Sequence, residues 1–258
     1  MVVSENGIIL AIGGLNESGE LTNLIDELDL KLKSKQWVST WPLNQPRTNF
    51  AVCTYKQYIY VVGGYDDSNH NCLTSVEYYD TNSKVWTEIT EPMLTARALC
   101  SAVVFNNKLY VFGGRTERYC SSLATVEYYD FEKKRWKQLD PMPVCNFSMS
   151  ISRIDNVIYL IGGSNACRRR VFKFDLQHFK WNEMPNVNMV CYGDCSSVGV
   201  MKNDLFVFMN NGGIFHCERY DRGKNQWQLV DRAGEQTDEF CHMITFNDIA
   251  LKSYGIYL

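Results

Sequence analysis

Leu109-Tyr-Val-Phe-Gly-Gly114, followed by Thr125-Val-Glu-Tyr-Tyr-Asp130 and then by Trp136, is the stretch of sequence that decides the fold. An apolar run ending in two glycines recurs along the chain, and the first glycines of successive pairs are 50, 50 and 49 residues apart. The four pairs are Gly13-Gly14, Gly63-Gly64, Gly113-Gly114 and Gly162-Gly163. A period near 50 residues, built from β-type residues, is typical of the blades of a β-propeller.

A tryptophan repeats in phase with the glycines and adds a fifth copy. The tryptophans are Trp37, Trp86, Trp136, Trp181 and Trp227. In the last four copies an aspartate stands six residues before the tryptophan, whereas Lys31 stands there in the first copy. The distance from the glycines to the aspartate varies between copies, so the variable part of the repeat follows the glycines. Loops on a rigid scaffold often carry binding specificity.

Each copy contains four strand-like segments, which we call strands a to d. In the third copy they are 100–105, 109–114, 125–130 and 135–139. The Asn106-Asn107 pair between strands a and b suits a tight turn, because asparagine tolerates positive φ. We interpret the glycines and tryptophans as architecture: glycine lets another group approach the backbone, and the tryptophan is the expected neighbour. Sheets this small must stack on one another to bury both faces.

Composition and charge exclude several classes of protein. The 26 basic and 29 acidic residues are mixed along the chain, which argues against binding to nucleic acid or to an anionic membrane. No apolar run approaches the roughly 18 residues that span a bilayer, and the first residues lack the basic start of a signal peptide. We therefore expect an intracellular protein that is cytoplasmic, with the nucleus as a further location.

The ten cysteines are spread thinly and lack the spacing of a known zinc finger or ribbon. We expect reduced thiols, no bound metal and no cofactor. The four histidines are scattered as well, and no Ser-His-Asp or paired-carboxylate grouping is visible in the sequence. The sequence therefore favours a protein without enzymatic activity, and a propeller enzyme is the less favoured alternative.

A strand ending in Gly-Gly, then Tyr-Asp, then a tryptophan six residues later resembles the Kelch repeat, and the resemblance covers nearly the whole chain. It implies an all-β fold, a β-propeller of four-stranded antiparallel blades in one domain over residues 1–258. The predicted repeats are 1–45, 46–95, 96–144, 145–190, 191–235 and a partial sixth, 236–258. The absence of any Trp-Asp dipeptide excludes a WD-repeat propeller.

The two ends of the chain depart from the repeat. The first copy starts directly at strand b, residues 7–14, and the fifth has Met209-Asn210 where Gly-Gly is expected. Residues 240–246 resemble a strand a, and 249–253 a further strand b without its glycines. We expect six-fold geometry with an incomplete last blade. A closed five-bladed ring is the alternative.

The resemblance implies a non-catalytic protein-interaction module. It is closest to the Kelch domain of BTB-Kelch adaptors of cullin-type ubiquitin ligases, which would give this chain an indirect link to a cullin ligase through substrate recognition. No BTB domain is present in the sequence given. Binding to actin or another part of the cytoskeleton is the alternative that other Kelch proteins suggest.

By the same resemblance, the partner would bind the face that carries the b–c and d–a loops. The candidate binding residues are Arg47, Asn49, Tyr65, Asp66, Arg97, Arg115, Arg118, Arg168, Arg169 and Arg170. The arginines after the third and fourth glycine pairs would form a basic patch for an acidic peptide, through charge-assisted hydrogen bonds. The alternative interpretation is that they are solvated loop residues.

Overall fold

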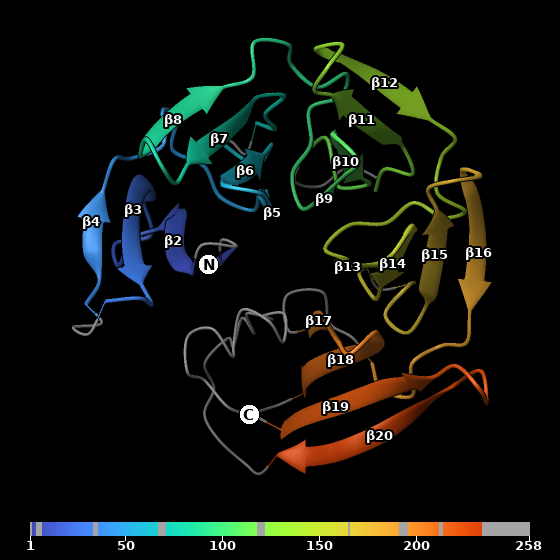
Figure 1. The fold of residues 1–258 in the computed structure, drawn as a ribbon. Coiled ribbons are helices and arrows are strands. Elements are labelled where there is room, and N and C mark those ends of the chain that lie inside the picture. The colour runs from blue at the N-terminus through green and yellow to red at the C-terminus, as the bar shows by residue number, and fades with distance from the viewer. Residues whose placement is uncertain are drawn as a thin grey trace. The chain divides into compact units, whose positions relative to one another are not determined.

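The fold is all-β. The computed structural model describes residues 2–3, 7–32, 36–66, 71–117, 122–164, 166–190, 196–211 and 214–233. Their regular structure consists of five four-stranded antiparallel sheets, each a blade of the predicted β-propeller (Figure 1). Five is the number of blades in the alternative prediction, and the partial sixth repeat lies outside the described residues. No helix in the described ranges is long and apolar enough to cross a membrane.

Each blade is made of four strands that are consecutive in the chain. Blade 1 contains β1 (Val2–Val3), β2 (Ile8–Leu15), β3 (Leu21–Asp29) and β4 (Val38–Thr40). Blade 2 contains β5 (Ala51–Tyr55), β6 (Tyr58–Val62), β7 (Val76–Asp80) and β8 (Val85–Glu88). Blade 3 contains β9 (Ser101–Phe105), β10 (Lys108–Phe112), β11 (Val126–Asp130) and β12 (Arg135–Leu139). Blade 4 contains β13 (Ser150–Ile154), β14 (Val157–Ile161), β15 (Val171–Asp175) and β16 (Lys180–Met184). Blade 5 contains β17 (Ser196–Met201), β18 (Asp204–Asn211), β19 (Ile214–Asp221) and β20 (Gln226–Ala233).

The contacts within the chain divide it into two compact units. Blades 1 to 3 belong to the unit that reaches Cys145, and blades 4 and 5 belong to the unit that starts at Asn146. The single domain expected over residues 1–258 stays a prediction.

Blade 1 has an inner strand, which the sequence pattern did not reveal. The two-residue strand β1 pairs antiparallel with β2, with Val2 opposite Leu10 and Val3 opposite Ile9. Strand a of blade 1 therefore comes from the N-terminal residues, and the expectation that the first copy lacks this strand is wrong. Two valines do not make a recognisable strand pattern by themselves, because alternation needs at least four residues to show.

The aspartate that begins the turn between strands c and d is present in all five blades. In blade 1 it is Asp29, which faces Ile8 as Asp80 faces Tyr58 in blade 2. The Asp29 carboxylate accepts a hydrogen bond from the Lys31 backbone N–H at 2.8 Å, as Asp80 does from Asn82 at 2.9 Å. Lys31 is therefore part of a longer turn and does not replace the aspartate, which corrects the alignment made by counting back from Trp37.

Blade 5 lacks the glycine pair, and its strands b and c stay paired over a longer stretch. Met209 and Asn210 lie where the other blades have glycine, as predicted, and here β18 and β19 continue to pair as far as Asn211 and Ile214. In blade 3 the equivalent pairing ends at Phe112 and Val126. A glycine pair with positive φ follows the end of strand b in blades 2, 3 and 4. In blade 1 the pairing continues past Gly13-Gly14 only with a register shift between Ile12 and Gly14, whereas the ordinary residues of blade 5 let the hairpin run on without a shift there.

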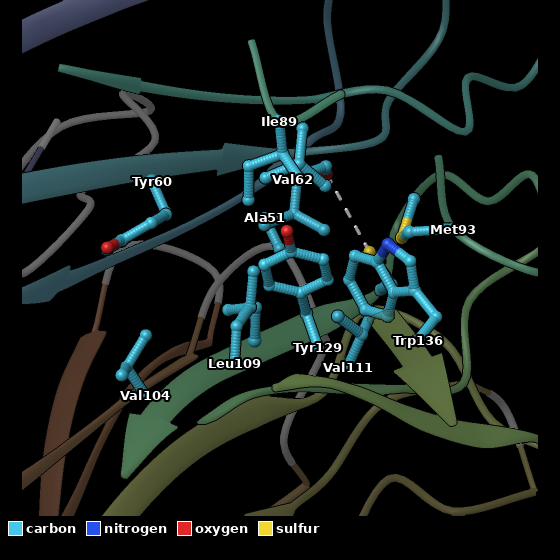
Figure 2. Close-up of a cluster of buried hydrophobic side chains, with 13 residues drawn as sticks. Ala51, Tyr60, Val62, Ile89, Met93, Val104, Leu109, Val111, Tyr129 and Trp136 are labelled. Atoms are coloured by element: carbon cyan, nitrogen blue, oxygen red, sulfur yellow. Dashed lines mark hydrogen bonds between the residues drawn. The ribbon is translucent and has the colours of Figure 1, made fainter. Parts of the chain in front are cut away.

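Apolar side chains fill the space between neighbouring blades within each unit. Between blades 2 and 3 the core includes Val62, Ile89, Val111, Tyr129 and Trp136, which Figure 2 shows packed together. Similar clusters join blade 1 to blade 2 and blade 4 to blade 5. Each small sheet thus buries a face against a neighbour in its own unit, as expected for a repeat fold.

Three of the five repeated tryptophans join their blade to the segment before it. Trp86, Trp136 and Trp227 are buried. The indole N–H of Trp86 donates to the Trp41 carbonyl at 3.0 Å, and Trp136 donates to the Glu91 carbonyl at 2.8 Å. Trp227 likewise donates to the Pro185 carbonyl at 2.9 Å. Trp37 differs, because 47% of its surface is exposed.

The backbone of the neighbouring segment, and not tryptophan, occupies the space beside the glycines. A Cβ atom at Gly63 would overlap the Arg97 carbonyl oxygen, and one at Gly64 would lie 2.7 Å from the Thr48 carbonyl oxygen. Both glycines have positive φ, 62° and 102°. The expectation that tryptophan fills this space is therefore wrong; the segment between strand d and the next strand a fills it.

Hydrogen bonds to the turn aspartates stabilise the fold above about pH 4, and this stabilisation is lost at lower pH. Hydrogen bonds from the backbone N–H groups of Lys133 and Glu132 lower the pKa of Asp130 from its ordinary value of 3.8, and the His178 side chain lowers that of Asp175. Because the folded pKa values lie below 3.8, this stabilisation is present above about pH 4 and is lost as the pH falls through the folded values.

We expect both carboxyl groups to titrate below pH 3.8 in a carboxyl-carbon NMR titration of the folded protein. Titration of Asp130 at or above 3.8 would contradict the assignment of the turn hydrogen bonds.

Candidate functional site

The candidate site is the end of the blades that carries the connections after the glycines and before each strand a. We call the segments 44–50 and 94–100 the corners before blades 2 and 3. We call the described residues after the glycine pairs, 64–66 and 71–73 in blade 2 and 114–117 and 122–124 in blade 3, the b–c loops. Together these four segments form the loop face of the first unit.

A buried arginine organises each of the two corners. Both side chains are fully buried, with no exposed surface on Arg47 or Arg97. The Arg97 guanidinium donates to the Gly113 carbonyl at 2.8 Å and forms an ion pair with Glu127 at 2.5 Å. The second oxygen of Glu127 accepts the Leu94 N–H at 2.7 Å, so Glu127 binds two residues of the same corner.

The corner before blade 2 repeats these contacts. Arg47 donates to the Gly63 carbonyl at 3.0 Å and pairs with Glu77 at 2.6 Å, and Glu77 also accepts the Asn44 N–H at 2.8 Å. Burial lowers the pKa of Arg47, and the adjacent Glu77 carboxylate opposes that shift. The guanidinium group therefore has its charge balanced in the interior, where an unpaired charge would be very costly.

Backbone hydrogen bonds extend this arrangement from blade to blade. Gly14 N–H donates to the Arg47 carbonyl at 3.1 Å, and Gly64 N–H donates to the Arg97 carbonyl at 2.9 Å. Gly63-Gly64 thus touches two corners: the Arg47 side chain of its own corner binds the Gly63 carbonyl, and the Arg97 carbonyl of the next corner accepts from Gly64. The loop face stands on a rigid frame of polar contacts.

The arginines that sequence reasoning assigned to partner binding belong to this frame. Arg47 and Arg97 cannot offer a guanidinium group to a partner, because both groups are enclosed and engaged by glycine carbonyls and glutamates. We correct their role to a structural one. Sequence alone contained a signal for it, since Glu77 and Glu127 stand 30 residues after the arginines at the same place in strand c.

Blade 4 replaces the arginine and the glutamate together. Asn146 stands at the corner, and its amide nitrogen donates to the Gly162 carbonyl at 2.9 Å, as the arginines do. Phe172, 4% exposed, takes the place of the glutamate opposite Leu160. The residue three positions before Asn146 is Pro143, which has no N–H to donate to a carboxylate. The charged pair and the backbone donor that supports it have therefore changed as a set.

Other predicted binding residues surround the two buried arginines on the loop face. Asn49 is exposed, has a φ of 54°, and its carbonyl accepts the Leu99 N–H at 2.8 Å. Tyr65 is buried and forms bridges to Thr48 and Cys72. Tyr65 is therefore another part of the frame, whereas Asn49 presents its side chain to solvent.

Asp66 and Arg115 lie in the b–c loops of blades 2 and 3, both partly exposed. The two loops are linked, because the Cys72 thiol donates to the Arg115 carbonyl at 3.2 Å. Burial raises the pKa of Cys72 to about 11, and the negative charges of Glu117 and Asp66 add to that shift. The loop face in the first unit thus combines Arg115 with two carboxylates. Arg118 lies outside the described residues.

The three consecutive arginines lie in the b–c loop of blade 4, in the second unit. Arg170 is bound by Glu183 through two hydrogen bonds of 2.8 and 2.9 Å, and its guanidinium lies 4.7 Å from the centre of the Phe172 ring. Arg169 is exposed, and its Nε donates to the Val187 carbonyl at 2.8 Å. Arg168 is partly exposed. Arg169 and Arg170 therefore bind acceptors from their own blade.

No group of three or more His, Cys, Asp or Glu side chains among the described residues is arranged to hold a metal ion. His70 and His242 lie outside those residues. The described part of the loop face therefore offers polar and charged side chains for recognition, and its geometry contains no assembled metal centre.

The comparisons with known proteins agree with the geometry. The model of a Kelch-repeat domain family, described as the KLHDC2/KLHL20/DRC7 Kelch-repeats domain, matches residues 1–213. The chain belongs to the Kelch-repeat family. Family membership identifies the chain as a protein-interaction module, since Kelch-repeat domains are in general non-catalytic and bind proteins.

Individual relatives match over shorter stretches. Kelch-like protein 4 of Homo sapiens is 35% identical over 89 residues, which cover 34% of this chain and 12% of that protein. An F-box/kelch-repeat protein of Arabidopsis thaliana is 33% identical over 101 residues, covering 39% of this chain and 24% of that protein. The matches span less than a quarter of the length of these relatives. The solved structure of YjhT shares the fold, with a TM-score of 0.72 at 16% identity, over 90% of this chain and 82% of that one.

Proposed function

We propose that this Kelch-repeat chain recognises a segment of a target protein through its loop face, and that it does so as the substrate-recognition part of a cullin-type ubiquitin ligase adaptor system. The observation that carries the proposal is the frame of Arg47 and Arg97, which holds the corners and b–c loops in fixed positions. A rigid scaffold that presents loops of variable sequence is the usual design of a recognition surface. An intracellular location is part of the proposal.

The side chains that would contact the target are the exposed or partly exposed ones that do not belong to the frame. In the first unit they are Asn49, Asp66 and Arg115, and in the second unit Arg168 and Arg169. An acidic peptide remains the proposed ligand of the arginines, because carboxylates form strong charge-assisted hydrogen bonds with guanidinium groups. The Asp66 carboxylate near Arg115 favours a target segment that carries both signs of charge.

Proximity labelling with the intact chain tests the proposal. We expect Arg115→Glu and Arg169→Glu, made separately because they lie in different units, each to reduce labelling of the main partner at least tenfold. Lys133→Glu, on an exposed turn between strands c and d, is the charge-matched control and should leave labelling unchanged. A partner set that survives both loop substitutions would refute recognition by these arginines.

The same experiment distinguishes a ubiquitin-ligase adaptor from a protein that binds the cytoskeleton. Recovery of cullin components with the wild-type chain supports the ligase proposal. Their absence, together with co-sedimentation of the purified protein with actin filaments, would support the cytoskeletal alternative instead.

A further inference from the structure

A cavity of about 500 Å³ opens between blades 2 and 3, apart from the loop face. The turns that border it join strands a to b and c to d, and include Lys56, Asn107 and Lys134. Its volume lies in the range of small-ligand sites, about 300–1,000 Å³. The surrounding blades belong to one unit, so the walls are fixed relative to one another.

Aromatic rings form the walls of the cavity. Tyr60 and Tyr78 lie side by side, with ring centres 5.8 Å apart, and Tyr58 meets Tyr78 edge-on at 5.5 Å. From blade 3, Phe131 approaches Tyr60 at 5.3 Å and Tyr129 at 5.6 Å. The Tyr60 hydroxyl points away from the aliphatic core between the blades (Figure 2). These rings offer an aromatic ligand several surfaces for stacked or edge-on contact.

At the neighbouring boundary, between blades 1 and 2, the equivalent position holds a carboxylate bound by two donors. Glu27 faces Leu10 there, as Tyr78 faces Tyr60 in the next blade. The Glu27 carboxylate accepts hydrogen bonds from the Lys84 ammonium at 2.8 Å and from the Tyr79 hydroxyl at 3.2 Å. Blade 1 thus supplies a carboxylate, and blade 2 supplies a lysine and a tyrosine that bind it.

Blade 3 keeps the two donors, but blade 2 does not supply the carboxylate. Tyr129 and Lys134 follow Tyr79 and Lys84 by 50 residues, and both lysines have positive φ at the same place in the turn, 58° and 47°. Both donors line the cavity. Burial raises the pKa of Tyr129, so its phenol stays protonated and can donate. Tyr78 stands where blade 1 has Glu27.

Three glutamates lie near these donors. The charge of the exposed Glu91 adds to the raised pKa of Tyr129, but among the described residues no hydrogen bond joins Glu91, Glu88 or Glu132 to Tyr129 or Lys134. Glu88 is paired with Glu77 across β7 and β8, so its side chain lies on the other face of blade 2, toward the Arg47 corner. Glu132 accepts a hydrogen bond from the Asn107 side chain at 3.3 Å. The cavity therefore has a lysine and a phenol positioned for an acceptor that the rest of the described site does not provide.

We propose that this cavity binds a ligand that carries both an aromatic ring and a carboxylate. The carboxylate binds between Lys134 Nζ and the Tyr129 hydroxyl, which correspond to the two groups that bind Glu27 at the adjacent boundary. The ring packs against Tyr60 and Phe131. A free aromatic acid and the C-terminal aromatic residue of a peptide both have this chemistry.

Calorimetric titration of the full chain with N-acetyl-L-tryptophan and N-acetyl-L-tryptophanamide tests the proposal, because the two probes differ only in the carboxylate. We expect the acid to bind at least tenfold more tightly than the amide. Lys134→Met should remove this preference, whereas Lys133→Met, its neighbour outside the cavity, should retain it. Equal binding of acid and amide to the wild-type protein, or a preference that persists in Lys134→Met, would overturn the proposal.

A second variant tests the same point without removing a donor. Tyr78→Glu gives blade 2 the carboxylate that blade 1 has, so it should pair with Lys134 and lower the affinity for the acid at least tenfold in a folded protein. Undiminished binding by folded Tyr78→Glu would also overturn the proposal.

An eight-residue peptide ending in tryptophan, compared with N-acetyl-L-tryptophan, identifies the source. Tighter binding of the peptide indicates a protein C-terminus, and tighter binding of the free acid indicates a small molecule. This site is independent of the loop face, so Arg115→Glu should leave these titrations unchanged.

Discussion

Replacing Arg97 with methionine should lower the free energy of unfolding by about 3–5 kcal/mol, because it leaves the Glu127 carboxylate buried beside a hydrophobic side chain. The substitution also removes the donors to the Gly113 carbonyl and to Thr125. Equilibrium unfolding in urea, followed by tryptophan fluorescence, measures the loss. Arg135→Met, an exposed arginine on strand d of the same blade, is the matched control and should change stability by less than about 0.5 kcal/mol.

Blade 4 suggests the compensating change. Because Asn146 and Phe172 replace the pair there, Arg97→Asn combined with Glu127→Phe should be less destabilising than Arg97→Met alone. Removing both charges avoids an unpaired ion, and the asparagine can still reach the glycine carbonyl. A double variant that is less stable than the single one would show that the buried charge is not the main cost.

The sequence predicted the blades well because their repeats combine signals that reinforce one another. Gly113-Gly114, the Asn106-Asn107 turn and Asp130 each specify a local backbone shape, and Asn106 and Asn107 have the expected positive φ of 51° and 56°. The same reasoning failed at blade 1, where two valines make strand a and two extra residues lengthen the turn after Asp29. Short segments and insertions weaken a pattern that depends on fixed spacing.

The candidate site was harder to predict, because the sequence does not say which polar residues are buried. Arg47 and Arg115 look alike as arginines near loops, but one is enclosed by Glu77 and a glycine carbonyl and the other lies in a partly exposed loop. The cavity between blades 2 and 3 has no motif at all. It depends on Tyr78 replacing a carboxylate that can be recognised only by comparing the register of β3 with that of β7.

Alanine substitution of two equivalent glycines should have very different costs. Gly14 and Gly64 are the second glycines of their pairs, with similar φ of 97° and 102°. A Cβ at Gly64 would lie 2.7 Å from the Thr48 carbonyl and 3.0 Å from Phe50 Cβ, whereas nothing lies within 4 Å of one at Gly14. The backbone strain is therefore shared, and the steric overlap belongs to Gly64 alone.

We expect Gly14→Ala to lower the free energy of unfolding by about 1–2 kcal/mol through left-handed strain. Gly64→Ala should cost about 2–5 kcal/mol, because the corner before blade 2 must also move, at a further ~1–3 kcal/mol. Urea unfolding of the two variants under the same conditions measures the difference. Equal losses would mean that φ alone explains the glycine pair; a larger loss at Gly64 would show that glycine is needed there so that the corner carrying Arg47 can approach strand b.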